Sequence, residues 1–402
     1  MVATSPLPLA LPMARTSRSP IVEAQSWVAG KTFASDRPLL NVSQAAPMAP
    51  PPLALRKEIA RIAVEEDSAH LYGAVLGQHG LRAEVAKSVN ATYLTPATNP
   101  VTAEDIAITS GANEAFTAVM STLAAHGDEV ILPTPWYFNH KMWCDMAGVT
   151  AVPLPTGEDM LPDLERAASL ITPRTRAIVL VTPNNPAGVE YPSDLLTKFY
   201  ALARAHGIAL VVDETYRDFD ARDGAPHILL RQPDWRDTLV QIYSFSKAYR
   251  LTGHRVGALT ASPERLLEVE KYLDTVTICP NQLGQRAALW GMQNLGDWLA
   301  EERREILKRR SALENGFAPL AAKGWTLLGT GGFFAYVAHP FDMPSSQLAP
   351  WLVDHAGVLL LPATFFTPQG DPRGERQLRI AFANLDCDGI TDLLDRLANI
   401  AP

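Results

Sequence analysis

Residues 244–257 include the side chains of this sequence that are best suited to covalent chemistry. These fourteen positions hold two serines, two arginines, two glycines and one lysine, Lys247. The pKa of a free lysine is about 10.4, so its amine becomes a nucleophile or proton carrier only where neighbouring cations or burial lower that value. An amine that can form an imine, beside hydroxyl and guanidinium donors for a phosphate, would suit a phosphorylated carbonyl cofactor. The same residues would also fit a basic surface loop.

A carboxylate and a phenol follow an apolar segment earlier in the chain. Asp213 comes directly after residues 209–212, and Tyr216 comes three residues later. An aspartate at the end of a strand can form a salt bridge with a protonated pyridine nitrogen, and a tyrosine can donate to a phenolic oxygen on the same ring. A strand-capping aspartate beside a packed tyrosine would give the same pattern.

Two turns and a group of aromatic residues follow other apolar segments. Residues 109–116 run through Gly111 into a predicted helix, whose first backbone N–H groups would bind phosphate or would simply be capped. Asn185 lies in the turn 182–188, which is also ordinary turn chemistry. In the aromatic group 136–138, Tyr137 is our first candidate to stack on a ring and Trp136 the second, although such residues could equally belong to the core.

One arginine, Arg379, lies inside an apolar segment near the C-terminus. A buried guanidinium without a partner is very costly, so it needs a carboxylate from the protein or from a ligand. A structural salt bridge is one interpretation of this residue, and a site for a substrate carboxylate is the other.

Taken together, these motifs resemble the class I and II aminotransferases of fold type I, which use pyridoxal 5′-phosphate (PLP). The resemblance covers residue 43 to the C-terminus and includes a serine, lysine and arginine at the family's spacing, Ser244, Lys247 and Arg255. It implies that Lys247 holds PLP as an imine and acts as a general base, with catalytic roles also for Asp213 and Tyr216. Arg379, together with Asn185, would bind the substrate.

The resemblance also implies the contacts of the cofactor. The phosphate would be bound by the start of a helix, two serines and an arginine, and the ring by an aromatic residue, an asparagine, an aspartate and a tyrosine. Tyr72 would reach the phosphate of a neighbouring subunit, which implies a homodimer with shared sites. The implied cofactor-binding residues are Tyr72, Gly111, Ala112, Asn113, Tyr137, Asn185, Asp213, Tyr216, Ser244, Ser246, Lys247 and Arg255.

The expected reaction is transfer of an amino group between an L-amino acid and a 2-oxo acid. Related enzymes with the same lysine catalyse C–S β-elimination or decarboxylation, and these remain alternatives. A PLP-binding regulatory module would need a DNA-binding region, and residues 1–40 show no helix-turn-helix pattern. Asp274 falls where dicarboxylate-specific members carry a second arginine, which disfavours an acidic substrate; Asp274 could instead attract a basic side chain. The loop 43–47 lacks a glycine often found in the family, and His254 replaces a usually apolar residue.

The segments that must position these residues alternate between strands and helices. Strands are predicted at 106–109, 129–132, 177–181, 209–212, 238–243 and 256–260, and later at 332–337, 358–361 and 378–382, before a last helix at 388–399. Strand–helix alternation favours a parallel sheet covered on both faces. We therefore expect an α/β fold, and the resemblance implies a large domain with a mostly parallel seven-stranded sheet and a smaller α/β domain.

We expect four regions along the chain. Residues 1–20 are predicted to be a flexible, unstructured leader, and residues 21–55 a segment that packs on the small domain and contains a proline-rich crossing loop at 45–55. Residues 56–290 would form the large PLP-binding domain and residues 291–402 the small C-terminal domain.

Composition restricts the class of protein. The 402 residues are 47% hydrophobic and 19% charged, which is typical of a globular enzyme. A net charge of -8 is the wrong sign for nucleic-acid binding. The longest apolar run, 333–338, is far shorter than the roughly 20 residues that span a bilayer. We therefore expect no membrane span. Three separated cysteines show no disulfide or metal spacing, so we also expect no bound metal and a cytoplasmic location.

Overall fold

A seven-stranded sheet forms the centre of the larger domain in the computed structural model, which describes residues 7, 9–47 and 49–402. The strand order is β2-β8-β7-β6-β5-β3-β4, and only β8 runs antiparallel to its neighbours. The strands are β2 (Ile106–Thr109), β3 (Glu129–Thr134), β4 (Thr150–Pro155), β5 (Thr175–Val181), β6 (Ala209–Asp213), β7 (Leu239–Ser244) and β8 (Gly257–Thr260). The predicted mostly parallel, seven-stranded sheet is confirmed.

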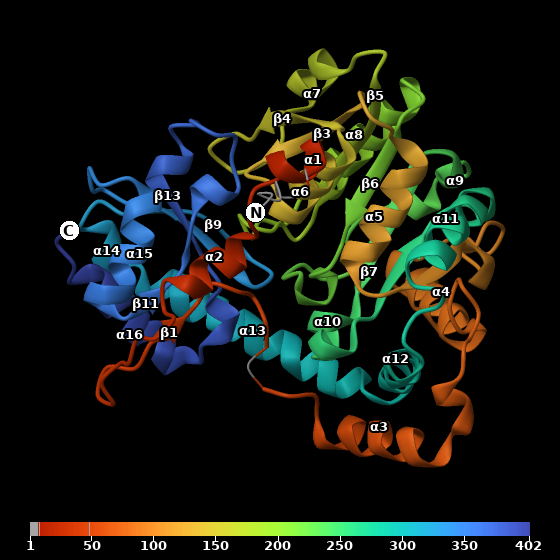
Figure 1. Cartoon of the computed structure of the whole chain (residues 1–402), viewed down its shortest axis with the longest axis horizontal. Helices are drawn as coiled ribbons and strands as arrows, with labels where there is room; N and C mark the ends of the chain where they lie inside the picture. The colour runs from red at the N-terminus through yellow and green to blue at the C-terminus, as the bar shows by residue number, and fades with distance from the viewer. Residues whose placement is uncertain (1–6, 8, 48) are drawn as a thin grey trace, which may run out of the picture.

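Helices cover both faces of this sheet (Figure 1). In β6, Leu210 and Val212 belong to one hydrophobic cluster and Val211 to another, as expected when successive side chains point to opposite faces and both faces are buried. The helices of this domain are α3 (Leu53–Glu65), α4 (His79–Tyr93), α5 (Ala112–Leu123), α6 (Phe138–Ala147), α7 (Leu164–Leu170), α8 (Ser193–Ala205), α9 (Trp235–Thr238), α10 (Phe245–Ala248), α11 (Pro263–Val276) and α12 (Gln282–Asn294).

The smaller domain has its own sheet and its own hydrophobic cluster, and the long helix α13 (Gly296–Gly316) runs between it and the large domain (Figure 1). Four strands pair in the order β12-β13-β10-β9. These strands are β9 (Thr326–Gly331), β10 (Phe334–Ala338), β12 (Leu361–Pro362) and β13 (Gln377–Ile380), and the remaining helices are α14 (Ala318–Ala321), α15 (Ser345–Ala356) and α16 (Cys387–Ala398).

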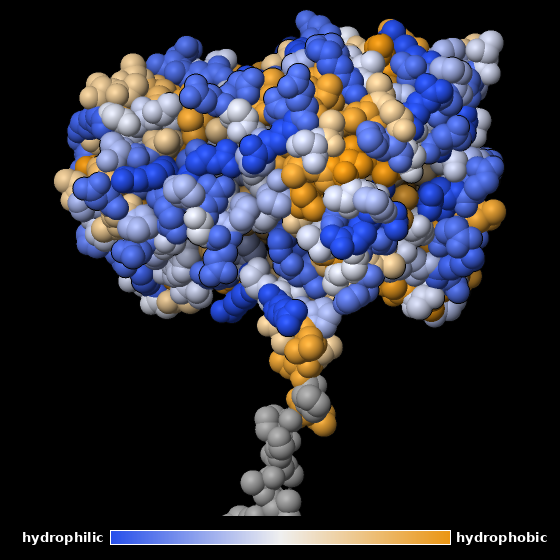
Figure 2. Space-filling model, turned by 90° about the horizontal axis from the view of Figure 1, so that it is seen from above, coloured by the Kyte–Doolittle hydropathy of each residue, from blue (hydrophilic) through white to orange (hydrophobic). Residues whose placement is uncertain are grey.

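The N-terminal segment joins the two domains. After α1 (Leu11–Arg15) and α2 (Pro20–Ser26), strand β1 (Leu40–Asn41) pairs in parallel with β11 (Val358–Leu359) of the small domain. The chain then crosses to α3, which packs on α12 of the large domain. Leu9 and Leu11 are exposed near the start of the described chain, where Figure 2 shows hydrophobic residues projecting from a mostly hydrophilic face.

Four sequence expectations need correction. Helix α1 lies within the leader that was predicted to be unstructured, and α3 begins inside the predicted loop 45–55; residues 1–6, 8 and 48 lie outside the described residues. Strand β4 was not predicted, because two prolines interrupt its sequence; prolines are tolerated there since β4 is an edge strand. Strand β9 was also missed, because two of its six residues are glycine.

Candidate active site

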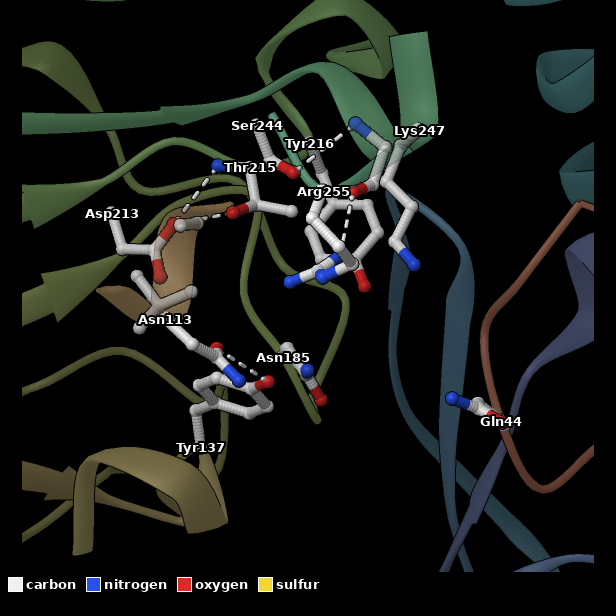
Figure 3. A pocket seen from close by; sticks show the side chains of 13 residues that line it. Gln44, Asn113, Tyr137, Asn185, Asp213, Thr215, Tyr216, Ser244, Lys247 and Arg255 are labelled. Carbon is white, nitrogen blue, oxygen red and sulfur yellow. Dashed lines mark hydrogen bonds between the residues drawn. The ribbon is translucent and has the colours of Figure 1, made fainter. Parts of the chain in front are cut away.

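The carboxyl ends of the parallel strands meet at one edge of the large sheet, and the predicted site residues gather there. Asp213 ends β6 and Ser244 ends β7, while Asn185 follows β5. Together with the start of α5 they line a cavity of about 260 Å³, into which Lys247 points from α10 (Figure 3). The lining residues are Gln44, Ala112, Asn113, Tyr137, Val181, Asn185, Asp213, Thr215, Tyr216, Ser244, Ser246, Lys247 and Arg255.

Lys247 is positioned by the short helix α10, directly after β7. Burial, followed by the positive charges of Arg255 and Arg379, lowers the pKa of its amine to about 8. Its Nζ donates a hydrogen bond of 2.5 Å to the carbonyl oxygen of Ala45, which belongs to the N-terminal segment. The environment therefore makes this amine far easier to deprotonate than an ordinary lysine.

Asp213 is buried and held on both of its oxygens. The hydroxyl and the backbone N–H of Thr215 donate to Oδ1 at 2.7 and 3.0 Å, and the Nε2 of His140 lies 3.3 Å from Oδ2. The His140 ring stacks on Phe116, with 3.8 Å between ring centroids. These contacts fix the orientation of the carboxylate toward the cavity (Figure 3).

The sequence interpretation missed both of these neighbours of Asp213. Thr215 carried a usable signal, because an aspartate often accepts a hydrogen bond from the residue two positions later. His140 carried none, since its contact with Asp213 joins two distant segments of the chain.

At one end of the cavity the backbone and side chains form a cluster of donors. Gly111 has φ +88°, and a Cβ there would overlap the guanidinium of Arg255. A Cβ on Gly257 would lie 2.5 Å from the carbonyl carbon of Gly111. Arg255 donates to the hydroxyl of Ser246 at 3.4 Å, and Ser244 accepts from the N–H of Ser246 at 3.3 Å. With the first N–H groups of α5, these donors suit an anion such as a phosphate.

Two tyrosines, Tyr137 and Tyr216, also line the cavity. The hydroxyl of Tyr137 donates to Oδ1 of Asn113 at 3.2 Å. Burial and the charge of Asp213 raise the pKa of Tyr137 to about 12. Trp136, the second candidate, is instead part of the core beneath β3. Tyr216 is buried beside Phe334, and burial raises the pKa of its phenol.

Arg379 lies in β13 of the small domain and reaches the same region. Its Nη1 donates to Oδ1 of Asn185 at 2.9 Å, and its Nη2 donates to the carbonyl of Ser43. The guanidinium lies against the rings of Phe334 and Phe366, 4.7 and 4.9 Å from their centroids. Burial lowers its pKa to about 10. Among the described residues Nε has no acceptor and Arg379 forms no ion pair with a carboxylate; Arg379 lines a cavity of about 400 Å³, which has room for a ligand's carboxylate.

Other residues singled out in the sequence lie away from this cavity. Tyr72 is 82% exposed and contacts no residue of the cavity in this chain, while the adjacent Gly73 packs closely against Gln282. His254 is half-buried, and burial lowers its pKa. Asp274 is exposed on α11. Among residues 7, 9–47 and 49–402, no group of three or more His, Cys, Asp or Glu side chains is arranged to hold a metal ion.

Comparisons with known proteins agree with this geometry. The family model for aminotransferase class I and II matches residues 37–397. An aromatic aminotransferase of Arabidopsis thaliana is 31% identical over 300 residues, which cover 71% of this chain and 72% of the relative. A glutamate-pyruvate aminotransferase of Escherichia coli is 30% identical over 66% of this chain and 65% of its own length.

Solved structures share the fold over almost the whole chain. An Escherichia coli protein described as having a methionine aminotransferase function has a TM-score of 0.86 at 22% identity, and the match covers 98% of this chain and 100% of that one. Aspartate aminotransferase from Thermus thermophilus with maleate also has a TM-score of 0.86, at 23% identity and with 98% and 99% coverage. This chain belongs to the class I and II aminotransferases, PLP-dependent enzymes of fold type I that transfer amino groups between amino acids and 2-oxo acids.

Proposed function

We propose that the cavity at the carboxyl edge of the large sheet is the aminotransferase site, with Lys247 as the residue that binds PLP and moves the proton. The observation that carries this proposal is that a reactive amine and an unpaired guanidinium lie in the same region of the protein. Lys247 has an amine with a pKa of about 8, and Arg379 is a buried guanidinium with no carboxylate partner in the described protein. One group suits an aldehyde and the other suits the carboxylate of an amino acid.

The donor set fits each part of PLP. Lys247 would hold the aldehyde, and the start of α5 with Ser244, Ser246 and Arg255 would hold the phosphate. Gly111 and Gly257 support this match, because a side chain on either would fill the space at the phosphate end. The remaining contacts proposed for the ring are Asp213 for its nitrogen, Asn185 and Tyr216 for its phenolic oxygen, and Tyr137 for its face.

When bound, PLP supplies an aldehyde and an electron-accepting ring. Arg379 binds the substrate carboxylate and so orients the Cα–H bond toward Lys247. The Nζ of Lys247 takes the proton from Cα, which requires its neutral form and therefore benefits from the lowered pKa. Asp213, whose carboxylate is held by Thr215, would supply a negative charge to the ring nitrogen.

The proposed substrate is not a dicarboxylate. Among the described residues, Arg379 is the only arginine besides Arg255 that lines this cavity or the adjoining one, and Arg379 is assigned to the α-carboxylate. Asp274, at the position expected for a second arginine, is an acidic residue on the exposed side of α11. A second carboxylate of a substrate would therefore lack the cationic partner that Arg379 provides for the first.

We also propose a homodimer in which Tyr72 completes the site of the partner. Tyr72 belongs to an exposed apolar patch with Leu71, Val276 and Ile278, which are 65%, 59% and 45% exposed. The backbone N–H of Gly73 donates to the sulfur of Cys279 at 3.4 Å, which brings the two halves of this patch together. Burying such a patch favours association.

The dimer can be tested by mixing two impaired variants, Tyr72→Ala and Lys247→Ala. A mixed dimer would contain one site with both native residues, so activity should return on mixing. A monomer in sedimentation experiments, or a mixture no more active than its components, would contradict the shared site.

A cytoplasmic location is proposed on the basis of three free cysteines, Cys144, Cys279 and Cys387. In the described part of the chain, no helix combines the length and the apolar character needed to cross a membrane.

The assignment of Lys247 is tested by reducing the PLP-loaded protein with borohydride and mapping the labelled peptide. We expect the label on Lys247 and loss of the label in Lys247→Ala. Arg250, in the same loop, provides a control through Arg250→Ala, which should still be labelled. A label at another lysine would overturn the proposal.

A further inference from the structure

The carboxylate of Glu214 is buried beside the site but does not line the cavity. Asp213, the residue before it, ends β6 and faces the cavity, as does Tyr216 (Figure 3). Successive residues of an extended chain point to opposite sides, and the side chain of Glu214 lies in the protein interior, where it is 1% exposed. Burying a carboxylate is costly unless donors surround it. The groups around Glu214 therefore indicate what the protein gains by keeping it there.

Three side chains from different parts of the large domain surround this carboxylate. The hydroxyl of Tyr93, at the end of α4, donates to Oε1 at 2.7 Å, and the amide of Gln241 on β7 donates to Oε2. The Nε2 of His227 lies 3.3 Å from Oε1 and makes no hydrogen bond to any other described group. All three side chains are buried, so bulk water cannot take the place of a missing donor.

The ring of His227 is held in one orientation. It is fully buried and stacks on the ring of Tyr93, with 4.5 Å between ring centroids. Its Nδ1 accepts a hydrogen bond from the backbone N–H of Leu229 at 3.3 Å. A ring nitrogen that accepts a hydrogen bond carries no proton, so the proton of the neutral ring is on Nε2, which faces Glu214. His227 is thus a donor directed at the carboxylate.

The backbone of Glu214 connects this buried cluster to the cavity. Its N–H donates to the carbonyl oxygen of Ile242 on β7 at 2.8 Å, and its own carbonyl oxygen accepts from the N–H of Arg217 at 3.0 Å. The second of these bonds closes a turn that contains Tyr216, and Asp213 directly precedes the turn. A shift of Glu214 would therefore move both residues that face the cavity from this segment.

We propose that Glu214 is a positioning residue for the contacts of PLP with Asp213 and Tyr216. The buried donors His227 and Tyr93 hold its carboxylate in place. This inference rests on the proposed function of the cavity. Neither the carboxylate nor its two donors line the cavity, so each acts through the backbone that joins Asp213 to Tyr216. A purely structural role would change the stability of the protein but not the titration or the affinity of PLP.

The test replaces His227 by two side chains that differ in the ability to donate. His227→Phe keeps a flat ring against Tyr93 but has no donor, whereas His227→Gln keeps an N–H group directed at Glu214. Each PLP-loaded variant is titrated, and the absorbance of PLP gives the pKa of its imine with Lys247. A displaced Asp213 would favour the protonated ring nitrogen less, and a neutral ring withdraws fewer electrons from the imine, so this pKa rises. We expect a rise of about half a pH unit or more in His227→Phe and a value close to native in His227→Gln.

The affinity for PLP and the kinetics give two further readouts. The dissociation constant of PLP, measured by equilibrium dialysis, should rise about tenfold in His227→Phe, which corresponds to the loss of about one hydrogen bond. The kcat should fall by about the same factor, whereas KM for the amino acid should stay near its native value, because Arg379 belongs to the other domain. His227→Gln should restore both the PLP affinity and kcat.

A matched pair of tyrosines tests the same proposal with a smaller change. Tyr93 and Tyr200 are buried in the same hydrophobic cluster, and each donates its hydroxyl to a carboxylate. The acceptor of Tyr93 is Glu214 at 2.7 Å, and the acceptor of Tyr200 is Asp234 at 3.1 Å. Tyr93→Phe should raise the midpoint of the PLP titration, and Tyr200→Phe should not. If His227→Phe does not fold, the comparison of these two variants decides.

The outcomes separate this inference from the function on which it rests. A native PLP titration, PLP affinity and kcat in folded His227→Phe, or equal midpoints in Tyr93→Phe and Tyr200→Phe, would overturn the positioning role and leave the function intact. Equal defects in His227→Phe and His227→Gln would overturn the role of His227 as a donor. An unlabelled Lys247 after borohydride treatment of the native protein would overturn the proposed function itself.

Discussion

The positive charge of Arg379 helps to lower the pKa of Lys247. Both are positively charged, and each lies in an environment that disfavours its charge, so the pKa of Lys247 falls to about 8 and that of Arg379 to about 10. A carboxylate that binds Arg379 neutralises one of the two charges. Binding of the carboxylate therefore removes part of the effect that lowers the pKa of Lys247, while burial of the amine, the largest cause, remains.

The lowered pKa of Lys247 predicts how the protein without PLP reacts with it. Only the neutral amine attacks the aldehyde, so the rate of imine formation should rise about tenfold per pH unit below 8 and level off above it. Arg379→Gln removes one of the positive charges, so the midpoint should move to higher pH. Stopped-flow absorbance after mixing with PLP measures the pH dependence of the rate in the native protein and in Arg379→Gln. A midpoint near the value of a free lysine would contradict the argument.

The buried charge of Arg379 should decrease the free energy of unfolding of the protein. At any pH below about 10 the folded protein carries the cost of a buried, unpaired charge. We expect Arg379→Met to raise the free energy of unfolding by about 1–2 kcal/mol and to lower kcat/KM at least a hundredfold. Urea denaturation followed by circular dichroism tests the first expectation, and a less stable variant would show that the surrounding protein compensates the charge.

At the scale of elements, much of the site could be predicted because its residues follow strands. Asp213 and Ser244 end neighbouring strands, Asn185 lies four residues after the end of the next one, and the ends of parallel strands share one edge. The rest could not be predicted, because it depends on contacts between distant segments. Nothing in the sequence indicates that His140 meets Asp213.

The turn into α5 gives a prediction at this scale. Gly111 and Gly127 both have positive φ, at +88° and +90°, but a Cβ at Gly111 overlaps Arg255 whereas a Cβ at Gly127 has open space. Each change to alanine should cost about 1 kcal/mol of stability through backbone strain. Only Gly111→Ala should weaken PLP binding, by at least tenfold in equilibrium dialysis. Equal PLP affinities of the two variants would argue against a phosphate site at the start of α5.

At the scale of the whole molecule, the two domains meet through closely approaching backbones. A Cβ on Gly188, in the turn that contains Asn185, would lie 2.5 Å from the carbonyl oxygen of Phe334, and a Cβ on Gly331 would overlap Gly188. Asn185 in turn accepts a hydrogen bond from Arg379. Asn185 and Arg379, which are proposed to bind cofactor and substrate, are therefore aligned by the backbone contact of Gly188 with Gly331 and Phe334.

This contact predicts that a single methyl group would disturb both domains. Gly188→Ala should destabilise the protein by about 2 kcal/mol or more, because neither backbone can yield easily, and should lower kcat as Asn185 moves away from Arg379. Gly207→Ala, at φ +63° with open space, is the control for backbone strain alone. Thermal melting and steady-state kinetics measure the two effects, and similar behaviour of the two variants would exclude a role for the contact.

The loop after β1 contacts both basic residues of the site through main-chain oxygens. The carbonyl oxygen of Ser43 accepts a hydrogen bond from Arg379, and that of Ala45 accepts one from Lys247. Point substitutions at these two positions can accumulate without removing either oxygen, so the missing family glycine need not impair the enzyme. Deleting one residue from the same loop would shift both oxygens together. One deletion would therefore remove the hydrogen bonds of both Lys247 and Arg379 to this loop. Tolerance of substitution combined with intolerance of length change is the signature that a mutational scan of this loop should reveal.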